Sequence, residues 1–139
     1  MPRLICLLVA SVGLSQAATI EMALNRMYNF DFPAADREMD RFIAEYPPDP
    51  LGQTFRAAAY LFRELDRLSI LEAEFFASDK KIADKKKLSL DLPLKERFLA
   101  AIDASKVKAE ARLATDAADK SALFALCLNA VFRSALYSH

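Results

Sequence analysis

The chain has 139 residues and a formal net charge of zero, a length that allows one small domain. Nucleic-acid binders usually concentrate lysine and arginine on one face, and the balanced charge argues against that class. Glycine occurs only at positions 13 and 52, which disfavours β-rich folds because these use glycine in hairpin turns and bulges. Alanine, leucine, lysine, arginine and glutamate dominate, and these strong helix formers predict an all-α fold.

Residues 1–17 have the pattern of a secretory signal peptide. Arg3 supplies a positive start, residues 4–14 are apolar, and Ser15 and Ala17 place small residues before a cleavage site. The apolar run is shorter than the about 20 residues that a membrane-spanning helix needs. We therefore predict export, to the periplasm or outside the cell, after cleavage following Ala17. The alternatives are an uncleaved anchor or a buried N-terminal helix.

Two cysteines occur, and Cys6 would be removed with the signal peptide. Cys127 then has no partner for an internal disulfide, so packing must supply the stability. Cys127 lies in the most apolar predicted helix. We expect a buried thiol that acts as a small hydrophobic side chain and not as a reactive group.

Two helices are predicted at the start of the remaining chain, over residues 18–29 and 32–46. Apolar residues recur in each at helical spacing. Asp31 can cap the second helix, Pro33 suits its first turn, and Pro47 follows its end. The pattern predicts an antiparallel hairpin, which with its flanking turn spans residues 18–49.

The next predicted helix is long, from 50 to 77, and its apolar stripes on two sides predict neighbours on both. Residues 78–92 break the pattern and are interpreted as an exposed, lysine-rich connector. A helix over 93–114 follows, so a second hairpin is predicted over residues 50–114.

The last predicted helix, 120–136, is apolar on every side and needs cover all round. Residues 115–139 are therefore interpreted either as the start of a further, truncated unit or as a self-association element. The apolar residues of that second interpretation are Leu123, Phe124, Leu128 and Phe132.

Residues 18–50 resemble a tetratricopeptide repeat, a helix–turn–helix unit of about 34 residues. Ala23 and Ala35 match the two small positions of that pattern, Phe32 matches the aromatic position before the second, and Pro47 matches the closing proline.

One period after Ala23 the chain has another small residue, Ala57, and Tyr60 follows where the family favours tyrosine. Phe42 departs from the pattern, since a small residue is usual there, and so does Arg26, where tyrosine is usual. The connector 78–92 also lengthens the second hairpin.

The resemblance implies a short tetratricopeptide-like solenoid of stacked antiparallel hairpins that binds a protein or peptide on its concave face. The candidate contact residues are Arg26, Gln53, Arg56, Tyr60 and Arg63. Some members of the family hold a peptide carboxylate with lysine and asparagine. The matching positions are Ile20, Leu24, Thr54 and Ala58, and none is a lysine or asparagine, so that recognition mode is not expected.

Catalytic chemistry is not predicted. The single histidine is His139, at the end of the chain, and no HExxH, CxxC or glycine-rich phosphate loop occurs. We expect no catalytic residue, no metal and no cofactor. The most distinctive predicted exposed feature is the cluster Lys80, Lys81, Lys85, Lys86 and Lys87, which is either a solvated loop or a contact with anionic lipid or an acidic partner.

The sequence thus predicts an exported, non-enzymatic protein-interaction scaffold with an unidentified protein or peptide partner and no nucleic acid. One alternative is a fragment of a larger enzyme or ligand-binding protein whose site lies in a missing C-terminal extension. Another is a helical protein that binds the membrane surface through the lysine cluster.

Overall fold

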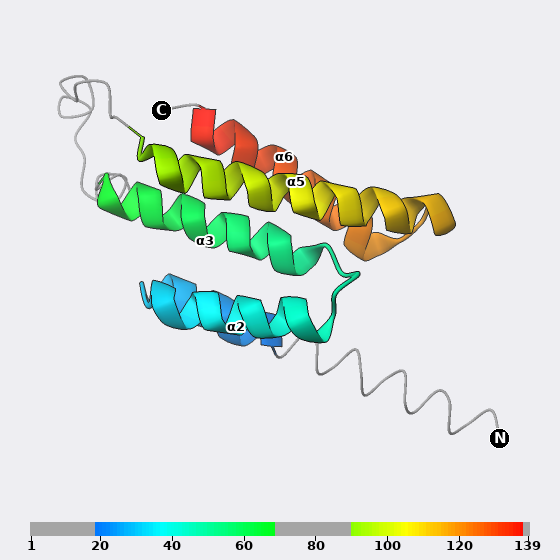
Figure 1. Cartoon of the computed structure of the whole chain (residues 1–139), viewed down its shortest axis with the longest axis horizontal. Coiled ribbons are helices and arrows are strands. Elements are labelled where there is room, and N and C mark those ends of the chain that lie inside the picture. The colour runs from blue at the N-terminus through cyan, green and yellow to red at the C-terminus, as the bar shows by residue number, and fades with distance from the viewer. Residues whose placement is uncertain (1–18, 69–89, 138–139) are drawn as a thin grey trace. The chain divides into compact units, whose positions relative to one another are not determined.

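The computed structural model describes residues 19–68 and 90–137, and every regular element within these ranges is an α-helix (Figure 1). The all-α prediction is therefore confirmed for the described part of the chain. The protein divides into two compact units, Met1–Pro47 and Pro48–His139.

The first unit is a helical hairpin made of residues 19–28 and helix α2, Phe32–Glu45. The first of these helices ends in a Schellman turn. The Phe30 N–H donates to the Met27 carbonyl at 3.0 Å, and the Asp31 N–H donates to the Arg26 carbonyl at 2.9 Å. Phe30 takes the left-handed position of this turn, with a φ of 59°, where glycine is usual. The predicted break between the first two helices is confirmed.

Helix α2 starts where its local signals predict. The Asp31 carboxylate accepts the Ala34 N–H at 3.2 Å, and Pro33 lies in the first turn. Proline costs nothing there because the first-turn N–H groups have no partner within the helix. The buried side of α2 carries Ala35, Met39 and Phe42, spaced by four and three residues as on one helix face.

The second unit contains three helices that each contact the other two: α3 (Leu51–Arg67), α5 (Leu92–Thr115) and α6 (Lys120–Tyr137). Helix α5 runs antiparallel to both α3 and α6, so α3 and α6 are parallel (Figure 1). Their shared apolar core consists of Ala57, Leu61, Phe98, Ala101, Ile102 and Leu136.

Helix α3 ends at Arg67, not at residue 77 as predicted. Leu68 caps this end: its N–H donates to the Glu64 carbonyl at 3.0 Å, and its ψ of 0° departs from the about −42° of a regular α-helix. Glu64, an acidic residue that helical patterning would place in water, is buried. Most of the predicted connector, with the lysine cluster, lies outside the described residues.

Aspartates form the turn between α5 and α6. Asp116 accepts the Ala118 N–H at 3.0 Å, and Asp119 caps α6 by accepting the Ala122 N–H at 2.9 Å. Arg112 donates its Nε–H to Asp119 at 2.8 Å and brings Nη1 within 3.6 Å of Asp49. Arg112 thereby ties the turn to the segment that leads into α3. The turn predicted before the last helix is confirmed.

A ring of three neutral polar side chains crosses the core between the helices. Thr54 on α3, Ser105 on α5 and Asn129 on α6 are all buried. The Asn129 Nδ2 donates to the Ser105 Oγ at 2.9 Å, and the Thr54 hydroxyl donates to the Asn129 Oδ1 at 3.1 Å. The Ser105 and Thr54 hydroxyl oxygens are 2.7 Å apart, and either can be the donor, so this contact closes the ring. The Thr54 hydroxyl is also 3.2 Å from the Pro50 carbonyl oxygen, a second acceptor for its proton.

The ring sets the register of the three helices. A slip of one helical turn moves a side chain by about 5.4 Å and would separate the members of the ring. Ser105 and Asn129 would then lose their partners in the ring, at a cost of about 1–3 kcal/mol per group, and Thr54 would keep only the Pro50 carbonyl oxygen. The in-register arrangement is therefore favoured over its slipped neighbours.

We predict that Asn129→Ala lowers the free energy of unfolding by about 2–3 kcal/mol. The substitution removes the hydrogen bonds that Asn129 makes with Ser105 and Thr54, and it opens a small cavity. The triple variant Thr54→Val, Ser105→Ala, Asn129→Leu should be more stable than Asn129→Ala, since it removes the polar groups together. Urea denaturation followed by circular dichroism measures both. Ser134→Ala, at an exposed position of α6, is the control and should be neutral. A triple variant less stable than Asn129→Ala would contradict the ring's role.

Candidate functional site

The outward side of α6 carries a stripe of exposed apolar residues. Leu123, Phe124 and Val131 are 48%, 51% and 56% exposed, and Cys127 lies exposed between them. These four residues are called the α6 stripe below. No charged residue occurs between Lys120 and Arg133, so the stripe meets water without a charge along three helical turns.

Cys127 was predicted to be buried, and this prediction is wrong. Helix α6 buries the side that carries Ala122, Ala125, Asn129 and Leu136. Cys127 lies two residues from both Ala125 and Asn129, which places it on the opposite side of the helix. Its thiol is therefore accessible.

Two of the four residues predicted for self-association belong to this exposed side, namely Leu123 and Phe124. The other two, Leu128 and Phe132, are half-buried, and Phe132 packs against the apolar core. The packing of α6 thus separates a set that the sequence treated as one surface.

The predicted contact residues lie in both units. Arg26 is exposed in the first unit, with its guanidinium 3.8 Å from the Asp31 carboxylate. The other four are half-buried and lie on one side of α3: Gln53, Arg56, Tyr60 and Arg63. The Arg63 guanidinium carbon is 5.9 Å from the Tyr60 ring centre, within range of a cation–π contact.

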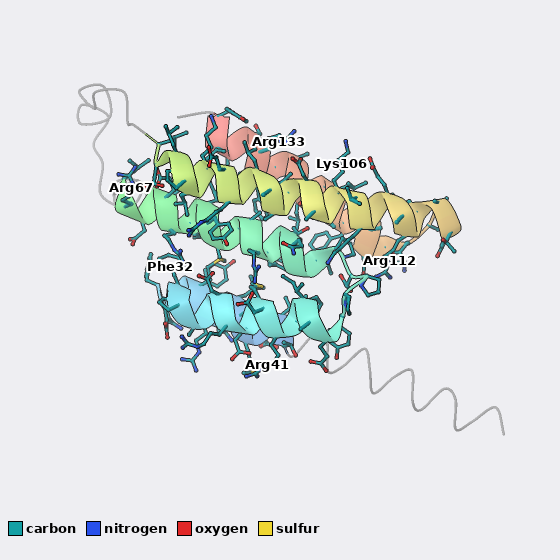
Figure 2. The ribbon with its side chains drawn as sticks, viewed as in Figure 1. Phe32, Arg41, Arg67, Lys106, Arg112 and Arg133 are labelled. Carbon is teal, nitrogen blue, oxygen red and sulfur yellow. The ribbon has the colours of Figure 1, made fainter. Side chains whose placement is uncertain are left out.

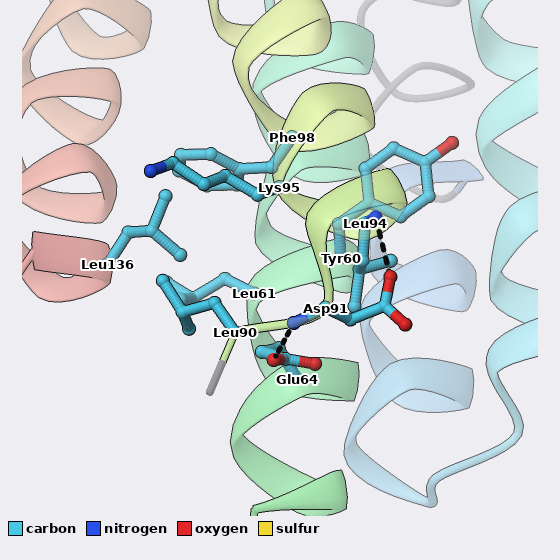
Figure 3. Close-up of a pocket in the computed structure, with 9 residues that line it drawn as sticks. All are labelled: Tyr60, Leu61, Glu64, Leu90, Asp91, Leu94, Lys95, Phe98 and Leu136. Carbon is cyan, nitrogen blue, oxygen red and sulfur yellow. Dashed lines mark hydrogen bonds between the residues drawn. The ribbon is translucent and has the colours of Figure 1, made fainter. Parts of the chain in front are cut away.

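Tyr60 also lines a small cavity where α3, α5 and α6 meet (Figure 3). Its volume of about 10 Å³ leaves room for no more than one water molecule. Glu64 lies at its edge and is 3% exposed. The Glu64 carboxylate accepts from Arg67 at 2.7 and 2.8 Å and from the Asp91 N–H at 2.8 Å.

These contacts determine the protonation of Glu64. The hydrogen bond from Arg67 lowers the pKa of Glu64 most, and the Asp91 N–H lowers it further, against the opposing effect of burial. Glu64 is thus held as a carboxylate that joins the end of α3 to the start of α5. This arrangement favours a structural role over one in proton transfer, which requires a carboxyl group that titrates near the working pH.

Two open grooves flank α5. One of about 520 Å³ is lined by Pro48, Val107, Ala111 and Thr115 together with Lys108, Arg112, Asp116 and Asp119. The other, of about 250 Å³, runs between α5 and α6. The larger groove has the volume of a small-molecule site, but Arg112 and Asp119 are already paired with each other at 2.8 Å. These two charged groups therefore hold each other and the turn, and are not available to bind a ligand.

Within residues 19–68 and 90–137, no group of three histidine, cysteine, aspartate or glutamate residues could hold a metal ion. Among the same residues, no helix is both long and apolar enough to span a membrane. Compared with known proteins, the chain matches no family model, no curated protein and no solved structure.

We predict that Glu64→Gln lowers the free energy of unfolding by about 1–2 kcal/mol at pH 7. Because folding lowers the pKa of Glu64 from its ordinary value of 4.5, its stabilisation is complete well above that pH. It is lost as the pH falls through the lowered pKa, since the carboxylate is then protonated in the folded state too. Urea denaturation at pH 7 and at about pH 3 should show the difference between wild type and variant shrinking at the lower pH.

The matched control is Glu110→Gln, which removes an exposed carboxylate 3.7 Å from Lys106. Exposed pairs of this kind contribute little to stability, so this variant should unfold like the wild type at both pH values. A Glu64→Gln effect of equal size at both pH values would contradict the ionic role of Glu64.

Proposed function

We propose that the protein is a non-enzymatic protein-interaction module that binds its partner through the α6 stripe. The observation that carries this proposal is the charge-free, exposed apolar surface of α6. Soluble proteins rarely leave a contiguous apolar patch in water unless it meets another surface, and interface cores are depleted in charge and enriched in aromatic residues such as Phe124.

The hydrogen bonds of the buried polar side chains support the proposal of a non-enzymatic interaction module. Thr54, Ser105 and Asn129 bond to one another, and Glu64 bonds to Arg67 and Asp91. The polar side chains that the described helices bury around the core are thus engaged in holding helices together.

A tetratricopeptide-like architecture is part of the proposal. The three small residues that carry the resemblance, Ala23, Ala35 and Ala57, are all fully buried, as close helix packing at those positions requires. In a repeat array the last helix exposes the side that the next repeat would cover. The α6 stripe is such a side, so a partner helix can bind where a further hairpin would pack.

The same surface supports a second candidate, in which a longer chain covers the α6 stripe with its own next hairpin. Export is proposed for either candidate, from the pattern in residues 1–17. The partner would then be met outside the cytoplasm.

Photo-crosslinking tests the interaction proposal. A benzoylphenylalanine probe at Phe124 should form a discrete protein adduct in the native cells, whereas the same probe at Val107 should not. Val107 is the matched control because it is also a large, exposed apolar residue, 66% exposed, but on α5. Equal labelling at both positions, or no protein adduct at Phe124, would contradict a specific binding surface.

Intact-mass spectrometry of the protein recovered from its native cells tests export. We expect a chain that begins at Ala18. A chain that retains Met1 would rule out cleavage, and additional mass at the C-terminal end would favour the second candidate, the longer chain.

A further inference from the structure

We infer that the α6 stripe binds the α6 stripe of a second copy, antiparallel and about a two-fold axis that passes near Cys127. This inference rests on the proposed function, because it names the partner of the same surface. It follows from the charges around the stripe, the sizes of its side chains and their positions along α6.

Along α5, the charges at the border of the stripe occur in pairs of opposite sign. Where α6 meets α5, Arg133 lies 3.3 Å from Asp103, and Lys106 lies 3.7 Å from Glu110 (Figure 2). These charges are paired within the chain, so the border along α5 offers no excess charge to attract an acidic or basic partner. Lys120, exposed at the start of α6, is the charge that lies beside the stripe. An apolar surface bordered on this side by paired charges is complementary to a copy of itself.

The ends of α6 favour the antiparallel orientation. Lys120 is exposed at the first residue of the helix, and the last turn contains no basic residue of its own. In an antiparallel pair, Lys120 lies beside the last turn of the second copy, whose carbonyl groups carry partial negative charge. A parallel pair would bring the two Lys120 side chains together.

The side chains of the stripe also match in size. With the two-fold axis between residues 127 and 128, Phe124 lies opposite Val131 of the second copy, and Val131 lies opposite its Phe124. Phe124 and Val131 are seven residues apart and so lie on the same side of α6. Cys127 and Ala130 are small, which allows the two helices to approach closely.

This arrangement brings the two Cys127 residues together. Packed helices have axes about 8–10 Å apart and Cα atoms about 2.3 Å from each axis. The Cα atoms of the two Cys127 residues are then roughly 4–6 Å apart, within the range of about 4.4–6.8 Å that a disulfide spans. Residue 134 of each copy would lie about 20 Å from its counterpart, given 1.5 Å per residue.

The test uses the full chain with Cys6→Ser, so that Cys127 is the only thiol. Analytical ultracentrifugation should show a dimer, and mild oxidation should give a disulfide-linked dimer through Cys127. When Cys127→Ser is combined with Ser134→Cys, oxidation should not link the copies. A parallel pair would link at both positions, so efficient linkage through residue 134 overturns the inferred orientation.

Two matched variants test the surface itself. Val131→Asp should raise the dimer dissociation constant roughly 100-fold or more, because each dimer would bury two unpaired carboxylates. Val107→Asp, at the exposed valine of α5, should leave the constant unchanged. Circular dichroism checks that both variants keep their helices, and the disulfide test does not depend on either variant.

A chain that stays monomeric at millimolar concentration, or a dimer that Val131→Asp does not weaken, overturns the inference. If a monomeric chain still forms an adduct with a different protein through the Phe124 probe, only self-association fails and the proposed function stands. If the probe forms no protein adduct, both fail.

Discussion

The packing of the second unit depends on the hydrogen-bonded ring of Thr54, Ser105 and Asn129. Each helix contributes one neutral polar side chain to a buried position, and each side chain finds its partners on the other two helices. Since an unpaired polar group in the core costs about 1–3 kcal/mol, α6 cannot rotate or slide freely against α3 and α5. The inward position of Asn129 also decides which side of α6 faces water, so the ring in the core determines the surface proposed to bind a partner.

Charged contacts hold the ends of this unit, where water reaches them. Arg67 joins Glu64 near one end, and Arg112 lies between Asp49 and Asp119 near the other (Figure 2). Both arginines keep part of their side chains in solvent, 48% and 34% exposed. Charges are costly to remove from water, which is why ion pairs suit the ends and neutral hydrogen bonds suit the middle. The α6 stripe lies between these ends and has neither kind of polar contact.

The sequence predicted where helices begin better than it predicted which side of α6 is exposed. The starts of α2 and α5 could be predicted because a proline in the first turn leaves a signal in the neighbouring residues. The end of α3 could not, because helix-forming residues continue past Arg67 in the sequence, and the contact that Glu64 makes there joins it to the backbone of Asp91, 27 residues away. The exposure of Cys127 was missed because α6 is apolar on every side. Asn129, the one polar residue between Ala122 and Phe132, would have indicated the wrong side, because polar side chains usually face water, whereas this one bonds to Thr54 and Ser105 in the core.

The sequence by itself determined that the described chain is helical, where several of its helices begin, and that its last helix has more apolar surface than one core can cover. These properties depend on contacts within about four residues along the chain, which a sequence displays directly. Only the tertiary structure decided which apolar residues of α6 are buried and which form the exposed stripe. That choice depends on hydrogen bonds between residues 24 to 75 positions apart, and the spacing of apolar residues within one helix carries no record of them.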